Sequence, residues 1–61
     1  MKFSYVIERY FEITTAEANL IKELYDMRKE FLAIKFIRGQ YAGLGQDESK
    51  QLCEAVNNHK Q

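Results

Sequence analysis

The first residues of the chain alternate between apolar and polar side chains with the period of a β-strand. Phe3, Tyr5, Ile7 and Phe11 fall on one face, which only Arg9 interrupts. This alternation, in a segment rich in aromatic and β-branched residues, is typical of a half-buried strand. The apolar residues of the segment also fit a helical stripe, which would make the protein all-α. The composition favours a strand over residues 2–12.

A capping box predicts the start of the first helix. Thr14 and Glu17 have the spacing at which the two side chains satisfy each other's free backbone amides. We expect this helix to run from about Thr15 to Met27. Its predicted inner side is made of four apolar residues at helical spacing: Leu20, Ile21, Leu24 and Met27.

A second helix is predicted over residues 29–40. The preceding residues 26–29 contain no glycine or proline, so one continuous helix as far as Arg38 is an alternative. We favour a tight turn, because a continuous helix would spread apolar residues around nearly its whole circumference. A helix this apolar is either buried on more than one side or presents an apolar patch to a partner.

Glycines predict the end of the second helix and the start of a third. Gly39 and Gly43 can both adopt the positive φ that terminates a helix, and the third helix is expected from about Gln46. Its predicted inner stripe is Ser49, Leu52, Cys53 and Val56. The predicted fold is therefore a small α+β domain over residues 1–61, with one N-terminal strand, a helical module over residues 13–56 and a frayed tail over residues 57–61.

Composition narrows the classes of function. The nine basic and nine acidic residues cancel, so the chain lacks the strong positive field typical of nucleic-acid binding. It also lacks the basic amphipathic face of a membrane-docking helix. We expect the single cysteine, Cys53, to be a small core residue. A lone thiol also indicates a cytoplasmic protein. A protein partner is the default expectation.

The reactive residues do not form a recognisable catalytic or metal-binding pattern. His59 is the only histidine and lies in the polar tail, where we expect it to be solvated. The glycines at 43 and 45 lack the third glycine and the preceding strand of a phosphate-binding loop. Serine and threonine residues have no partner base. We therefore expect no enzymatic activity, no cofactor and no metal.

A run of residues across the second and third predicted helices resembles a known family. Its members are Ile34–Lys35, Arg38–Gly39, Gly43–Leu44–Gly45, Glu48, Lys50 and Leu52. In this order they resemble the C-terminal domain of the bacterial ribosomal large-subunit stalk protein, over about residues 31–56. Residues 38–55 also resemble, more weakly, the ubiquitin-associated-like N-terminal domain of elongation factor Ts. Both likenesses imply short helices around a glycine turn and a protein-binding surface.

The stalk resemblance implies a helix-turn-helix that binds translation factors, notably elongation factor GTPases. By position, the implied contacts are Phe31, Leu32, Ile34, Lys35, Arg38 and Lys50. Lys35 and Arg38 are three residues apart and so share one helix face, and Lys50 is expected to converge with them across the turn. The expected function is a non-enzymatic protein-interaction module, such as a small bacterial or bacteriophage adaptor or inhibitor that contacts translation or other host machinery.

Two other functions remain open at this point. One is a helix-turn-helix regulator that reads nucleic acid with the third helix, although Asp47 and Glu48 occupy the turn where phosphate contacts are usually made. The other is a structural accessory subunit.

Self-association is expected from the N-terminal strand. A single strand has no partner within the chain, so its amides and carbonyls invite another strand. We therefore predict an antiparallel homodimer in which the self-association residues are Phe3, Tyr5, Ile7 and Phe11. The alternative is that the strand extends the sheet of a partner.

Overall fold

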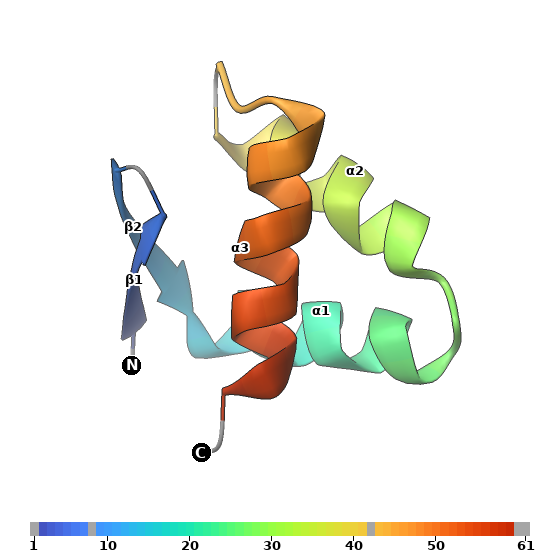
Figure 1. Ribbon diagram of the computed structural model, residues 1–61. Helices are drawn as coiled ribbons and strands as arrows, with labels where there is room; N and C mark the ends of the chain where they lie inside the picture. The colour runs from blue at the N-terminus through green and yellow to red at the C-terminus, as the bar shows by residue number, and fades with distance from the viewer. Residues whose placement is uncertain (1, 8, 42, 60–61) are drawn as a thin grey trace.

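The computed structural model describes residues 2–7, 9–41 and 43–59 of the chain. Within these residues it has two strands and three helices: β1 (Lys2–Ile7), β2 (Arg9–Thr14), α1 (Thr15–Asp26), α2 (Glu30–Gln40) and α3 (Gln46–Asn58). The strands form an antiparallel hairpin beside the helices, and α3 packs against both α1 and α2 (Figure 1). The predicted small α+β class is confirmed, and the all-α alternative is wrong.

The N-terminal segment is a hairpin of two strands, so the prediction of one strand over residues 2–12 is wrong. Phe3 pairs with Ile13 and Tyr5 pairs with Phe11. Ile13, which we assigned to the helical module, ends the alternating pattern of β2. Residues 2–14 contain no Gly, Pro, Asn or Asp, the residues that mark hairpin turns, and the turn was missed for that reason.

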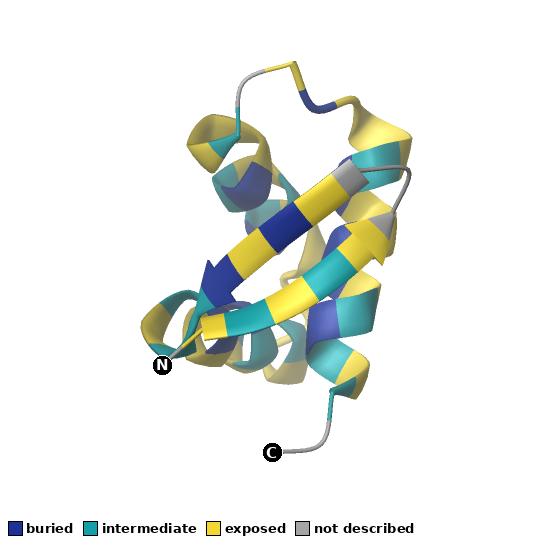
Figure 2. Ribbon diagram, turned by 90° about the vertical axis from the view of Figure 1, so that its left-hand side faces the viewer, coloured by how far each residue is buried: buried dark blue, intermediate teal, exposed yellow. Residues whose placement is uncertain are grey.

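The hairpin buries one face and exposes the other (Figure 2). On the inner face, Phe11 is 4% exposed and Ile13 is fully buried, whereas Phe3 and Tyr5 are half-buried against the same core. Since opposite residues of an antiparallel pair lie on the same face, the register places these four side chains together. The hairpin thus forms one wall of the core.

Polar contacts run across the outer face of the hairpin. The Tyr10 hydroxyl donates to the Glu12 carboxylate at 3.1 Å and lies 2.9 Å from the Ser4 hydroxyl. Lys2 Nζ lies 3.6 Å from the same carboxylate. Val6, which is 78% exposed, is the apolar exception on this face.

The predicted capping box is present at the start of α1. The Glu17 amide donates to Thr14 Oγ1 at 3.1 Å, and the Thr14 amide donates to Glu17 Oε1 at 3.0 Å. These two bonds satisfy donors that a helix start otherwise leaves free. The box therefore fixes the point at which β2 becomes α1.

The buried side of α1 differs in part from the prediction. Ala18 and Ile21 are buried, and Leu24 packs against the core. Leu20 and Met27, predicted to face inward, are 39% and 52% exposed. At 3.6 residues per turn, a stripe centred on Ile21 places both of them at its margin. The sequence pattern gave the correct side of the helix but too wide a buried stripe.

A tight turn separates α1 from α2, as predicted, and the continuous-helix alternative is wrong. The Lys29 amide donates to the Leu24 carbonyl at 2.8 Å, and the Arg28 amide donates to the Tyr25 carbonyl at 3.0 Å. This pair of bonds is the Schellman motif, which usually has glycine at the position of positive φ. Here Arg28 holds that position, with a φ of 60°.

The turn between α2 and α3 uses one of the two predicted glycines. Gly39 lies within α2, so its predicted role in ending the helix is wrong. Gly43 has a φ of 79°, and the Leu44 amide donates to the Tyr41 carbonyl at 3.4 Å across the turn. The turn brings the buried Leu44 back over the core before α3 begins.

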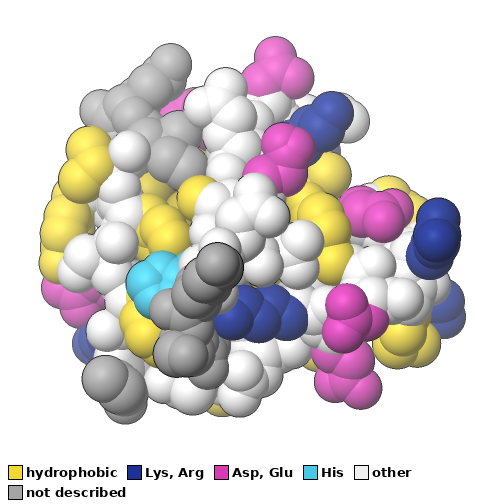
Figure 3. Space-filling view, turned by 60° about the horizontal axis from the view of Figure 1, so that its bottom comes forward, with side chains coloured by type: hydrophobic (Ala, Val, Ile, Leu, Met, Phe, Trp, Pro, Cys, Tyr) yellow, Lys and Arg dark blue, Asp and Glu magenta, His cyan; other side chains and the backbone are white. Residues whose placement is uncertain are grey.

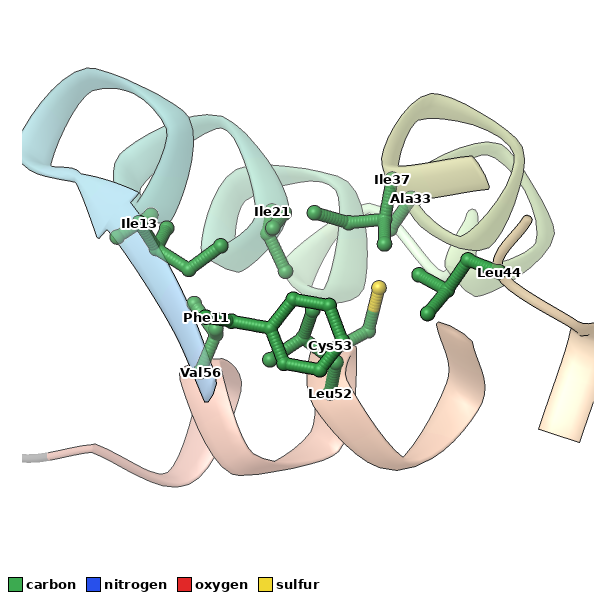
Figure 4. Packing of buried hydrophobic residues seen from close by; sticks show 10 residues of the cluster. Phe11, Ile13, Ile21, Ala33, Ile37, Leu44, Leu52, Cys53 and Val56 are labelled. Carbon is green, nitrogen blue, oxygen red and sulfur yellow. The ribbon is translucent and has the colours of Figure 1, made fainter. Parts of the chain in front are cut away.

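The core lies where the three helices and β2 converge (Figure 4). The predicted stripe of α3 is confirmed, because Ser49, Leu52, Cys53 and Val56 are all fully buried. Ser49 is the one buried polar residue of this set, and its hydroxyl donates to the Gly45 carbonyl at 2.7 Å. Cys53 is a small core residue, as expected.

The end of the chain is more ordered than the predicted frayed tail. The helix α3 continues to Asn58, and His59 packs on the hairpin with ring centroids 4.7 Å from Phe3 and 5.8 Å from Tyr5. Lys22 Nζ donates to the His59 carbonyl at 2.9 Å. Figure 3 shows the histidine ring, in cyan, beside hydrophobic side chains. The prediction of a solvated histidine is therefore wrong, and residues 60–61 of the predicted tail lie outside the described residues.

Candidate functional site

The outward face of α2 holds half of the six side chains that the stalk resemblance singled out. Ala33 and Ile37 are fully buried and anchor the inner side of the helix. Phe31, Lys35 and Arg38 follow the spacing i, i+4, i+7, which places them together on the opposite side. All three are exposed. We call these three residues the α2 stripe.

The α2 stripe combines an aromatic ring with two cationic side chains. The Phe31 side chain is 67% exposed, the largest exposure of an aromatic residue among the exposed large hydrophobics. Lys35 and Arg38 make no hydrogen bond or ion pair with the residues that the structure describes. Their charges are therefore directed at solvent rather than used within the fold.

The other implied contact residues are not part of this stripe. Ile34 is half-buried and packs against the core, and Leu32 is half-buried as well. Lys50 is exposed on α3, and no hydrogen bond or ion pair connects it to the described part of α2. The resemblance named six residues, and the helix geometry gathers three of them.

Met27 is an exposed apolar residue that the sequence reasoning placed in the core. It caps α1 directly before the Schellman turn and is 52% exposed. It lies at the margin of the buried stripe that is centred on Ile21, and the helix ends there.

The residues predicted for self-association line the protein's own core instead. Phe11 is buried, and Phe3 and Tyr5 pack against the core cluster from the hairpin. The side chain of Ile7 lies outside the described residues. Because β1 already pairs with β2, the unpaired strand from which we argued for a homodimer does not exist in this form.

Two titratable groups near the core, the Cys53 thiol and the Tyr25 phenol, have raised pKa values. Burial, with a smaller contribution from Glu54, raises the pKa of Cys53 to about 12. Burial, with smaller contributions from Cys53, Glu54 and Glu30, raises the pKa of Tyr25 to about 12 as well. A thiol with this pKa holds little of the nucleophilic thiolate form at neutral pH. Cys53 therefore serves packing.

The described surface offers little concavity for a small molecule. No pocket is found over residues 2–7, 9–41 and 43–59, and the same residues hold no group of three or more His, Cys, Asp or Glu side chains arranged for a metal. Among the described helices, none combines the length and the apolar character needed to cross a membrane.

Comparison with known protein families, with curated proteins and with solved structures finds no match to this chain.

Proposed function

We propose that the chain is a non-enzymatic protein-interaction module that binds a partner on the α2 stripe. The observation that carries the proposal is the exposure of Phe31, which leaves 67% of a large aromatic side chain in water on a helix whose other side forms the core. Aromatic residues and arginine are enriched at the centres of protein interfaces. Phe31 and Arg38 bring both types to one face.

The charges of the stripe define the partner surface that would fit it. Lys35 and Arg38 have no acidic partner among the described residues, so an acidic patch would gain two charge-assisted contacts without breaking any within the fold. Complementary charge also accelerates encounter between partners. The fitting partner is an acidic surface with an apolar hollow for Phe31.

A translation factor is the partner class that the stalk resemblance suggests. Under this proposal the chain is a small bacterial or bacteriophage adaptor or inhibitor that contacts an elongation factor GTPase. The α2–turn–α3 arrangement around Gly43–Gly45 is compatible with the helix-turn-helix that the resemblance implies.

The test is a titration of the ¹⁵N-labelled chain with a purified bacterial elongation factor GTPase, followed by amide chemical shifts. We expect shifts concentrated between residues 31 and 38, and a loss of binding in Lys35→Glu. Lys29→Glu is the matched control, because it reverses the same charge at an exposed position before the stripe. A glutamate at position 29 also interacts favourably with the positive N-terminal end of the α2 dipole, so this variant should stay folded.

Two outcomes would contradict parts of the proposal. Binding that Lys35→Glu and Lys29→Glu weaken equally would mean that only net charge matters and that the stripe is not the site. Absence of any binding would remove the translation-factor partner. In that case, capture from a bacterial lysate with the wild type and with the Phe31→Ser variant tests whether the stripe binds another protein.

A further inference from the structure

The two edges of the hairpin are treated differently by the rest of the fold. Along β2, the Thr14 amide donates to Glu17 Oε1 at 3.0 Å, and the Glu12 carbonyl accepts a bond of 2.7 Å from the Tyr41 hydroxyl. A carboxylate and a phenol thus occupy backbone groups that a neighbouring strand would need. Covering an edge in this way prevents pairing with other chains. The β2 edge is closed.

The capping box also shows which backbone groups of β1 point outward. The Thr14 amide, which donates to Glu17, and the Glu12 carbonyl, which accepts from Tyr41, both point away from β1, and their partners across the hairpin are Lys2 and Ser4. Hydrogen-bonded and non-hydrogen-bonded pairs alternate along an antiparallel ladder. The pairs made by Lys2, Ser4 and Val6 are therefore the non-hydrogen-bonded ones. Their amides and carbonyls point away from β2.

The described residues leave the β1 edge open. Outside the hairpin ladder, no backbone or side-chain hydrogen bond of the described residues reaches the backbone groups of Lys2, Ser4 or Val6. These three residues present alternating donors and acceptors over the length of five residues. An edge of this kind is a template for an additional strand.

The helix α3 provides a surface on which a strand added at this edge would lie. It contacts β1, passes beneath it and continues beyond it toward the end of the chain (Figure 2). His59 lies there against the rings of Phe3 and Tyr5, which are only half-buried. A strand added beside β1 would lie over the end of α3 and cover the remaining surface of these rings.

The position of α3 argues against a second copy of the chain as the partner that binds the β1 edge. Two copies joined edge to edge are related by a two-fold axis perpendicular to the sheet, so both would carry their helices on the same face. Each α3 reaches past its own β1, and the two helices would meet under the shared edge. A lone extended segment brings no helices and avoids this conflict.

We propose that the β1 edge binds an extended segment of a partner protein by strand addition. The backbone groups of Lys2, Ser4 and Val6 supply the hydrogen bonds. The segment has apolar side chains at alternate positions, because those positions lie beside Phe3 and Tyr5 above α3. The positions between them are polar, beside Lys2 and Ser4 on the outer face. This site is separate from the α2 stripe, and neither proposal depends on the other.

The probe for the test is a display library of random linear peptides, selected against the immobilised full chain. Selected peptides are then measured against two synthetic chains. One carries a methyl group on the backbone nitrogen of Ser4, and the other carries it on that of Tyr10, which points outward at the closed β2 edge. Neither change removes a bond within the hairpin ladder, and circular dichroism confirms that both chains fold.

We expect peptides with alternating apolar residues whose binding falls at least about tenfold on methylation at Ser4, as loss of a hydrogen bond to a blocked edge implies. Methylation at Tyr10 should leave their binding unchanged. The proposal is overturned if no peptide is selected or if both methylated chains bind as well as the wild type. It is also overturned if light scattering shows a dimer that methylation at Ser4 dissociates, because the occupant is then a second copy. Ser4→Pro provides a recombinant version of the same block.

Discussion

Replacing Arg28 by glycine should stabilise the protein, because this arginine holds the glycine position of a Schellman motif. Its φ of 60° lies in the left-handed region, which costs an L-residue roughly 1–2 kcal/mol. The side chain is exposed and makes no hydrogen bond or ion pair with the described residues, so its removal forfeits little within the fold. Glycine removes the strain but adds freedom to the unfolded chain, at a cost of about 0.4–1 kcal/mol. The net gain is about 0.8 kcal/mol, the middle of a range of about 0–1.6 kcal/mol.

Thermal unfolding followed by circular dichroism measures this gain. A domain of this size gains roughly 4–8 °C in Tm per kcal/mol, so a gain of about 0.8 kcal/mol should raise the Tm of Arg28→Gly by about 3–6 °C. Arg28→Ala is the matched control, because it removes the same side chain and keeps the left-handed strain. Its Tm should stay close to that of the wild type. Urea titration gives the same comparison as a free energy of unfolding.

The comparison between the two variants decides the argument. If Arg28→Ala stabilises as much as Arg28→Gly, the gain comes from removing a charge and the backbone strain is not the cause. If Arg28→Gly is less stable than the wild type, the turn does not hold a left-handed residue at this position. The first result would refute the argument from backbone strain, and the second would refute the assignment of the turn.

Three further changes test other parts of the fold by urea denaturation. Thr14→Ala should lower the free energy of unfolding by about 1 kcal/mol through loss of the capping box, whereas Thr14→Ser should retain most of it. Gly43→Ala should cost about 1 kcal/mol, because Gly43 has a φ of 79° and no atom crowds a new Cβ, while Gly39→Ala inside α2 should gain a similar amount. A reversed order of the two glycine variants would contradict the turn geometry. The raised pKa of Cys53 keeps its thiol protonated in the folded state between its ordinary value of 9.0 and about 12. Unfolding in that range releases a proton, so stability should fall as pH rises, by up to about 1.4 kcal/mol per pH unit. Cys53→Ala should show a shallower fall, and an unchanged slope would contradict the raised pKa.

The helical part of the fold was predicted well because two local signals marked it. The capping box at Thr14 and Glu17 set the start of α1, and the apolar stripe of α3 identified four buried residues. Each of these signals acts within one or two turns of a helix. Local chemistry therefore determined the helices.

The hairpin was missed because its turn contains no turn-forming residue. The alternation of β1 and β2 can be read as one continuous strand unless a glycine or asparagine marks the reversal. The pairing of Phe3 with Ile13 depends on both strands covering the same helices, which is a tertiary effect. The docking of His59 on Phe3 is tertiary for the same reason, since 56 positions in the chain separate them.

The candidate site was only partly predictable. Spacing alone places Phe31, Lys35 and Arg38 on one face of a helix. Spacing does not tell which face the core will cover. The structure places Ile34 at the core side, and no hydrogen bond or ion pair connects Lys50 to the described part of α2. The closed β2 edge could not be foreseen either, because Tyr41 reaches Glu12 only once α2 is in place.

The contact between β1 and α3 joins the first element of the chain to the last. During synthesis, the hairpin emerges long before the helix that seats its first strand, and a two-stranded hairpin alone is marginally stable in water. A nascent chain that ends before α3 thus lacks the surface on which Phe3 and Tyr5 rest. A chain that ends before α3 also lacks the helix against which α1 and α2 pack, so we expect the native fold to form only after α3 has left the ribosome.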